Sequence, residues 1–187
     1  YGYTFVEHLF DIGGWGTVDR AYVELPLSTE QIMHPERYPD DVPTEENLPE
    51  FSDILGNGWE EIDRNTMGEW FTYLILAKGL NEDARLEEAD ASIAAEGWGG
   101  DAYVVYFNAE ASSTVMVLHT SWDTTRDADE FTAAFKDYAN ARFSASSKDT
   151  WLGEDGFHSF HQIDDTTTWI LAPDENTAMM VWQALQP

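Results

Sequence analysis

The sequence predicts an α+β fold, in which N-terminal helical hairpins are followed by a four-stranded antiparallel sheet with two helices. Apolar residues recur at helical spacing over much of residues 1–98. After Gly99-Gly100 the period changes to that of strands, and a hairpin followed by a helix then occurs twice, as β-β-α-β-β-α. This order favours helices packed on one face of the sheet. We therefore expect a helical region at 1–98 and an α+β region at 99–187, which can share one core.

The chain opens with two short amphipathic segments. The first ends at Gly13-Gly14, and the second ends at Pro26, because glycine and proline interrupt helical geometry. The apolar residues of the two stripes are Phe5, Leu9, Ile12, Val18, Tyr22 and Leu25. We expect these residues to face one another in a helical hairpin.

A short capped helix is predicted at STEQIMHPERY, residues 28–38. Ser28 followed by Gln31 is a capping-box spacing, in which the serine hydroxyl accepts from the third backbone N–H of the helix. Pro35 disfavours helical geometry at His34, so the helix is only about two turns long. Within it, Glu30 and His34 are four residues apart and can point in the same direction.

A loop and two longer helices are predicted next. Residues 39–53 contain three prolines and many acids, which is typical of an extended connection. Residues 59–96 then show helical periodicity, with a break at Gly79 and an end at Gly97. The expected apolar face of the first helix consists of Ile62, Met67, Trp70, Phe71, Leu74 and Ile75.

The C-terminal half contains two predicted hairpins, each followed by a helix. The helices cover residues 123–143 and the stretch from Asp174 onward, where Asp and Thr residues are suitable N-caps. The four predicted strands are residues 102–108, 114–122, 156–164 and 167–173.

The net charge of the chain is extreme. Nine basic residues stand against 36 acidic ones, which gives −27 at pH 7. Self-repulsion of this size weakens a compact state, but molar salt shortens the screening length to about 3 Å. The composition therefore favours a halophilic protein, although an acidic mesophilic protein is the alternative. We expect inorganic cations at the acidic surface, and neither nucleic acid nor anionic membrane as a partner.

Other features exclude several classes of site. The chain has no cysteine, which rules out disulfides, thiolate nucleophiles and cysteine-ligated metals. The longest aliphatic stretch is YLILA at 73–77, well short of the roughly 20 residues of a membrane span. The start, YGYTF, is neither a methionine nor a signal peptide, so we expect Tyr1 to lie within a longer sequence.

Five phrases of residues 4–135 together carry a family resemblance. In order they are GGWGTVDRAY, P-x-STEQIMHPERY, MGEW, AAEGWGGDAY and WDTTRDADEF. The combination resembles the C-terminal half of a family of bacterial and archaeal surface proteins related to HExxH zinc metallopeptidases. The resemblance implies an extracellular or cell-surface location, since the haloarchaeal members of that family are secreted. It also implies that the HExxH helix and a further glutamate ligand lie upstream of the stretch that this chain covers.

Catalytic zinc chemistry has no signature within this sequence. HExxH is absent, and two histidines on one helical turn are what position zinc and its water. We therefore assign no catalytic residue and no cofactor to this chain, and expect zinc only together with an upstream segment. Glu30 and His34 are the candidates to face a cleft, as metal ligands or as groups supporting a metal site. Two ligands do not make a zinc site, and the alternative is a capped surface helix in which His34 only packs.

The remaining histidines favour structural roles. His158 and His161 lie in one predicted strand at an odd separation, so they point to opposite faces and cannot chelate one ion together. His119 lies among apolar residues of another predicted strand, where packing is expected.

The sequence thus predicts a salt-adapted extracellular or cell-surface protein that forms the non-catalytic portion of a metallopeptidase-like scaffold. Its partner would be another protein or a missing N-terminal half. One alternative is the C-terminal part of an active zinc metallopeptidase whose HExxH segment lies upstream. Another is a subunit or adhesion module of a surface assembly.

Overall fold

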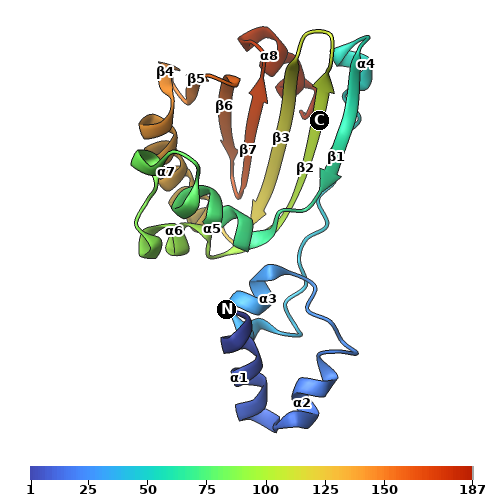
Figure 1. Cartoon of the computed structure of the whole chain (residues 1–187), viewed down its shortest axis with the longest axis vertical. Coiled ribbons are helices and arrows are strands. Elements are labelled where there is room, and N and C mark those ends of the chain that lie inside the picture. The colour runs from blue at the N-terminus through green and yellow to red at the C-terminus, as the bar shows by residue number, and fades with distance from the viewer. Residues whose placement is uncertain (187) are drawn as a thin grey trace.

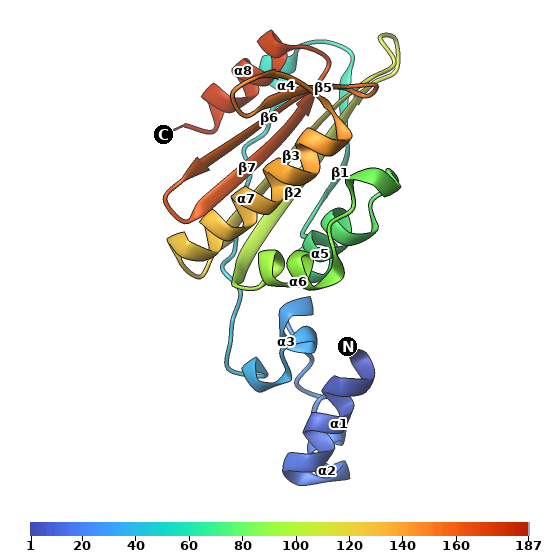
Figure 2. The same cartoon turned by 90° about the vertical axis from the view of Figure 1, so that its left-hand side faces the viewer.

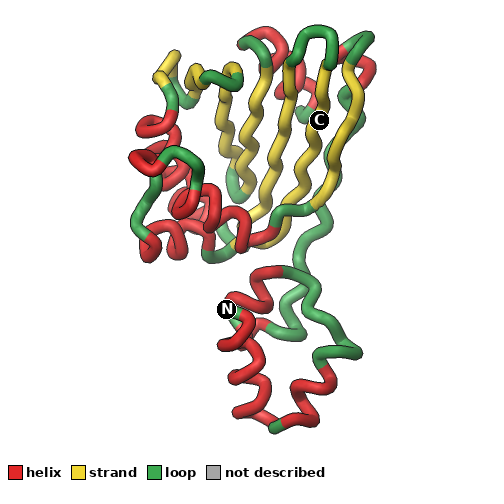
Figure 3. Tube along the Cα trace, viewed as in Figure 1, coloured by secondary structure: helices red, strands yellow, loops and turns green. Residues whose placement is uncertain are grey.

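The computed structural model describes residues 1–186, and it places them in two parts (Figure 1). A helical unit, residues 2–37, lies below a larger sheet domain, residues 51–186. An irregular link, residues 39–50, runs between them and appears as loop in Figure 3. The two parts meet where the helix at 29–33 packs against the helix at 68–78.

One antiparallel sheet of seven strands, in the order β1-β2-β3-β7-β6-β5-β4, forms the centre of the sheet domain. The α+β class is therefore confirmed, but the prediction of four strands was too low. The strands are β1 (Trp59–Asn65), β2 (Trp98–Asn108), β3 (Ser113–Trp122), β4 (Ser144–Ser147), β5 (Thr150–Gly153), β6 (Gly156–Ile163) and β7 (Thr166–Ala172). The four predicted strands correspond to β2, β3, β6 and β7, the central part of the sheet.

Helices cover both faces of the sheet, rather than the single face expected (Figure 2). On one face α5 (Gly68–Lys78), α6 (Glu88–Ala95) and α7 (Thr125–Arg142) pack over a core that includes Trp98, Trp122 and Phe135. On the other, α4 (Ser52–Leu55) and α8 (Glu175–Ala184) cover a core rich in valine, together with part of the link. The central strands β2, β3, β6 and β7 supply both cores, because successive side chains point to opposite faces of the sheet.

The helical unit has a small core of its own. It consists of α1 (Gly2–Gly13), α2 (Trp15–Arg20), α3 (Thr29–Met33) and the 3-10 helix η1 (Pro35–Arg37). Phe5, Leu9 and Val18 are buried together, as the apolar stripes predict. Ile12, Tyr22 and Leu25 were wrongly expected inside, and they are instead largely exposed. The unit is too small to enclose every apolar residue of its sequence.

The helical prediction for residues 59–96 was wrong for residues 59–65 and for much of the stretch after Gly79. Residues 59–65 form β1, the edge strand that pairs with β2, and Ile62 is 60% exposed. Acidic side chains on this edge discourage pairing with a further strand. Beyond α5, the expected long helix is reduced to the 3-10 helix η2 (Glu82–Ala84) and α6.

The helix caps of the C-terminal half are confirmed. The Thr124 side chain accepts from Asp127 N at the start of α7, and Asp174 Oδ1 accepts from Thr177 N at the start of α8. The longest helix, α7, has 18 residues. None of the helices within residues 1–186 combines the length and the apolarity that a membrane span needs.

Candidate functional site

The N-terminal cap of α3 orients the residues that the sequence singled out. Ser28 Oγ accepts from Gln31 N at 3.2 Å, which confirms the predicted cap. The Gln31 side chain accepts from Leu27 N at 2.7 Å and donates to Asp41 O at 2.6 Å. Gln31 is fully buried, so these bonds fix both the entry to α3 and the course of the link. With this face turned inward, Glu30 is buried as well.

The start of α5 is held from two sides. The buried Asp101 carboxylate accepts from Met67 N and Gly68 N, both at 2.7 Å, and from Trp98 Nε1 at 2.8 Å. Thr29 Oγ1, from the helical unit, accepts from Trp70 N at 3.1 Å. A carboxylate at a helix N-terminus is favourable because the backbone N–H groups there are unpaired and partly positive. These bonds join α3, α5 and β2.

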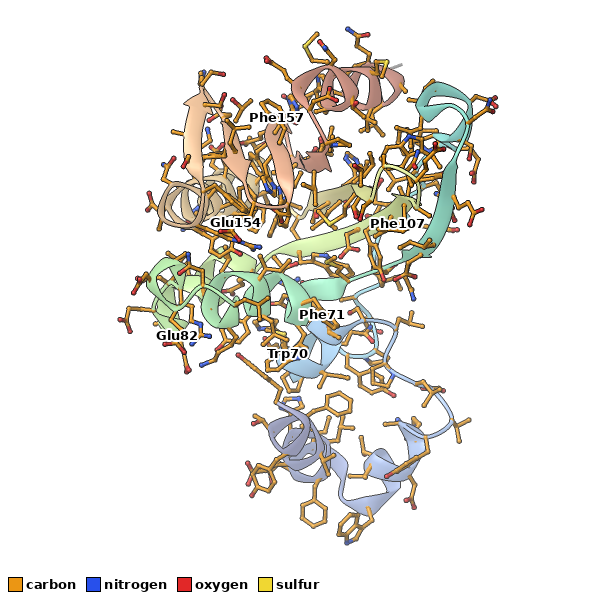
Figure 4. All side chains as sticks on the ribbon, turned by 45° about the horizontal axis from the view of Figure 1, so that its top comes forward. Trp70, Phe71, Glu82, Phe107, Glu154 and Phe157 are labelled. Atoms are coloured by element: carbon orange, nitrogen blue, oxygen red, sulfur yellow. The ribbon has the colours of Figure 1, made fainter. Side chains whose placement is uncertain are left out.

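The two parts also touch through aromatic rings at this point. The rings of Tyr1 and Trp70 meet edge to face with centroids 5.0 Å apart. Figure 4 shows Trp70 at the side of α5 that faces the helical unit. Aromatic pairs of this geometry add about 0.5–1.5 kcal/mol beyond the burial of their area.

A cluster of charged side chains fills the remaining space between α3, η1 and α5; we call Glu30, His34, Arg37 and Glu69 the junction cluster. Arg37 Nη1 donates to Glu30 Oε1 at 2.6 Å and to Asp123 Oδ2 at 2.8 Å. A third contact, to Asp41 Oδ2, is 3.0 Å. One guanidinium therefore ties α3 to the link and to the start of α7. Glu30 is 2% exposed, whereas the Arg37 side chain is 25% exposed, so the pair is buried on the side of the glutamate.

His34 and Glu69 form the second half of the cluster. His34 Nε2 lies 2.8 Å from Glu69 Oε1, in the first turn of α5. Glu69 has no exposed surface, and its Oε2 has no hydrogen-bond partner among residues 1–186. Because a buried carboxylate with one free oxygen is costly, its position depends on His34.

Burial dominates the protonation of the carboxyl groups. It raises the pKa of Glu30 to about 8, although Arg37 opposes the shift. It also raises the pKa of Glu69, against the effect of the hydrogen bond from His34. That hydrogen bond in turn raises the pKa of His34. The cluster therefore retains protons at pH values where exposed carboxyl groups have lost theirs.

An open cavity of about 520 Å³ lies beside the cluster, between α3, the link and the start of α5. Ile32, Met67 and Trp98 supply apolar walls, and Glu45 and Glu46 supply acidic ones. Trp98 is 1% exposed and lies at the wall of this cavity. Glu30 and His34 instead direct their polar atoms at Arg37 and Glu69.

The link reaches the sheet at a pair of glycines. Thr44 N donates to Gly99 O at 2.7 Å. A Cβ at Gly100 would lie 2.3 Å from Thr44 O, so only glycine permits this approach. Gly97 is similarly constrained, because a Cβ there would lie 2.6 Å from Cγ of Asp127. The glycines after α6 thus serve close backbone packing.

The side chains of the junction cluster join the helical unit to the sheet domain through hydrogen bonds and ion pairs. The cluster has proton-binding groups, but each is engaged with another element of the fold. Across the described residues, no group of three or more His, Asp or Glu side chains is arranged to hold a metal ion.

The other histidines lie in the sheet. The register places His158 and His161 on opposite faces, as expected from their odd spacing. His158 is buried, with Nε2 2.9 Å from Asp155 Oδ1, and Nδ1 accepting from Trp169 Nε1 at 3.2 Å. Burial lowers its pKa. His119 is partly exposed, with Nδ1 2.8 Å from Thr168 Oγ1.

Four residues at the junction escaped sequence reasoning: Arg37, Glu69, Asp101 and Asp123. Each lies in one of the phrases that carried the resemblance, which are HPERY, MGEW, GWGGDAY and WDTT. The structure brings these phrases together around one junction although they span residues 26–131. The phrases were therefore a usable signal, but pairing them requires the three-dimensional course of the chain.

Comparison with known proteins bears on the sheet domain. Residues 55–182 match a domain of unknown function, DUF8575. This range begins at the end of α4 and ends within α8, so it contains the whole sheet and excludes the helical unit. Neither curated proteins nor solved structures gave a match. Since the matched range covers more than half of the sequence, the chain belongs to the DUF8575 family.

Proposed function

We propose that this chain is a salt-adapted extracellular or cell-surface protein and forms the non-catalytic portion of a metallopeptidase-like scaffold. The observation that carries the proposal is the engagement of Glu30 and His34. Glu30 Oε1 accepts from Arg37, and His34 Nε2 is bound to a fully buried glutamate. In this role the two residues hold the helical unit on the sheet domain.

Zinc ligation by Glu30 and His34 would have to break their contacts with Arg37 and Glu69. A zinc ion needs lone pairs of imidazole and carboxylate groups at about 2.0–2.2 Å. Recruiting Glu30 and His34 would leave Arg37 without Glu30 and Glu69 without His34 in a buried site. Arg37 would keep Asp41 and Asp123, but the buried Glu69 would lose its one hydrogen bond, and an unsatisfied buried polar group costs about 1–3 kcal/mol. The geometry therefore favours a positioning role.

The charge distribution supports the salt-adapted location. Seven of the nine basic side chains form ion pairs with acids: Arg37, Arg64, Lys78, Arg85, Arg126, Lys136 and Arg142. Even so, acids outnumber bases four to one, so most of the acids have no basic side chain available to pair with them. Such a surface binds inorganic cations loosely and repels phosphate backbones and anionic lipids.

Zinc binding tests the scaffold proposal. The purified chain would be loaded with zinc chloride in molar KCl, dialysed and measured for metal content, beside H34Q and the control H8Q on α1. We expect far less than one zinc per chain in all three. One tightly held zinc per chain, lost in H34Q and retained in H8Q, would contradict the proposal. It would place a metal site within this chain, which neither the scaffold role nor an upstream HExxH segment predicts.

A second candidate function, a subunit of a surface assembly, is favoured by the exposed apolar residues of the helical unit. Ten of the twenty large apolar side chains that are exposed among the described residues lie in residues 1–27. Trp15, Tyr22 and Val23 are each at least 67% exposed. A stable dimer buries about 800 Å² per partner, and a concentration of exposed apolar side chains in one small unit is the kind of surface that such an interface uses. A second copy of the chain is the occupant that we test.

Self-association can be measured by light scattering after size exclusion in molar KCl. If the apolar surface assembles copies, the mass should rise with concentration, and Y22S/V23S should abolish the rise. L80S is the matched control, because Leu80 is 95% exposed but lies on the sheet domain. A constant monomer mass, or an equal effect of L80S, would exclude this candidate.

A further inference from the structure

A second pocket lies on the face of the sheet that α8 covers. Its lining residues are different from those of the junction cluster. Its floor is a row of three side chains on adjacent strands. In the register, Thr168 of β7 is opposite His119 of β3 on one side and His161 of β6 on the other. Directly opposed residues point to the same face of a sheet, so all three line one surface. We call this pocket the sheet trough.

The link and residues 182–186 form the walls of the sheet trough. Asn47 lies on the side of the link, and Trp182 and Gln186 lie on the side of α8. The Trp182 ring stacks on His161, with centroids 3.8 Å apart and planes 7° from parallel. The pocket encloses about 300 Å³, at the small end of the range for ligand sites. Because strands supply the floor, its polar groups are held rigidly.

The floor keeps hydrogen-bonding capacity for a ligand. His119 uses Nδ1 on Thr168, and His161 uses Nε2 on Ser159. Within residues 1–186, the other ring nitrogens, His119 Nε2 and His161 Nδ1, make no hydrogen bond, although Glu46 Oε2 lies 3.7 Å from His119 Nε2. Burial lowers the pKa of both imidazoles, so both are neutral at pH 7 and each offers a donor or an acceptor.

The charge of the lining selects the class of ligand. None of the described residues that line the trough is Asp, Glu, Lys or Arg, although 24% of the chain is charged. An anion would find no cationic partner there and would meet the field of a chain with net charge −27. A cation would find one carboxylate near the floor, that of Glu46 beside His119, and too few further ligands among the described residues to replace its water. A neutral ligand loses the least on entering this pocket.

We propose that the sheet trough binds a neutral, polyhydroxylated ring, such as one unit of a sugar. Sugar hydroxyls both donate and accept, which matches the neutral imidazoles, the Thr168 hydroxyl and the amides of Asn47 and Gln186. The C–H faces of a sugar ring match the apolar part of the lining, which includes Leu48 and Trp182. The site is independent of the junction cluster and of the scaffold proposal.

Saturation-transfer NMR on the full chain in molar KCl tests the proposal. The probes are glucose, galactose, mannose and N-acetylglucosamine, with sodium acetate and zinc chloride as charged comparisons. We expect at least one sugar to bind with a dissociation constant of about 1–10 mM, the range of weak neutral recognition. We expect neither acetate nor zinc to displace the bound sugar.

Variants locate the binding. T168V keeps the shape of the floor and removes its hydroxyl, and H161F keeps the stacking on Trp182 and removes the ring nitrogens. Each should weaken sugar binding at least tenfold, whereas H8F on α1 should leave it unchanged. N47A and Q186A alter exposed wall residues without touching the core, and they should weaken binding even if a floor variant unfolds. Thermal melts verify folding.

Three results would overturn the proposal. One is the absence of saturable binding for all four sugars up to about 100 mM, a limit near 1.4 kcal/mol of standard binding free energy. Another is sugar binding that all four trough variants leave unchanged. Binding of zinc at the trough in preference to every sugar would likewise replace this ligand class with a metal.

Discussion

Replacing Glu30 by glutamine should remove a large part of the pH dependence of folding. The folded-state pKa of Glu30 is about 8, against an ordinary value of 4.5, because the carboxyl group is buried. Since the folded value is the higher one, the stabilisation is fully present below pH 4.5 and is lost as the pH rises through 8. The difference amounts to roughly 4–5 kcal/mol at about 1.4 kcal/mol per pH unit. Glutamine is close in shape and can still accept from Arg37.

The assay is urea unfolding at constant molar KCl, followed by tryptophan fluorescence between pH 5 and 8. The quantity of interest is the unfolding free energy of E30Q minus that of the native chain at each pH. It should rise by several kcal/mol across this range, with E30Q the more stable at the alkaline end.

The matched control is E36Q, on the neighbouring 3-10 helix. The Glu36 side chain is 67% exposed, so its variant should follow the native pH profile. If E30Q also runs parallel to the native chain, or if its advantage shrinks as the pH rises, the burial argument for Glu30 is refuted.

Three other predictions concern the junction and the surface. G68A should lose about 2–4 kcal/mol of stability, because φ at Gly68 is +79° and the new Cβ would lie 2.5 Å from Thr29 Oγ1. Thermal melting would measure the loss. The control is G16A, which should change the melting temperature little because a Cβ at Gly16 meets open space. T29V should lose about 1 kcal/mol by leaving Trp70 N without its side-chain acceptor; an unchanged melting temperature would show that the contact is dispensable. The unfolding free energy of the native chain should rise between about 0.1 M and 2 M KCl as acidic repulsion is screened, and cooperative folding of equal stability at the lower concentration would contradict salt adaptation.

Local sequence patterns were sufficient to predict the central strands and the helix caps. Strands β2, β3, β6 and β7 carry apolar residues on both faces, and their extended runs are recognisable without any partner. The caps at Ser28, Thr124 and Asp174 were also recognisable, because a cap depends only on residues within one turn.

The edge strands β1 and β4 were not recognisable in the sequence, because none of their residues is buried. In β1, five of seven residues are exposed and acids occupy both faces, so no alternation remains. The four residues of β4 are all exposed. Such segments become strands because a neighbour offers a row of hydrogen bonds, and strand preference of this kind depends on context.

The amino-acid sequence by itself determined the α+β class, the central hairpins, the caps and the extreme acidity. These follow from residue type and short-range spacing. Only the tertiary structure decided that Glu30 and His34 meet Arg37 and Glu69, and that His119, Thr168 and His161 form one row. The reason is physical: burial, pairing and protonation depend on which distant segments come into contact, and distance along the chain does not encode that directly.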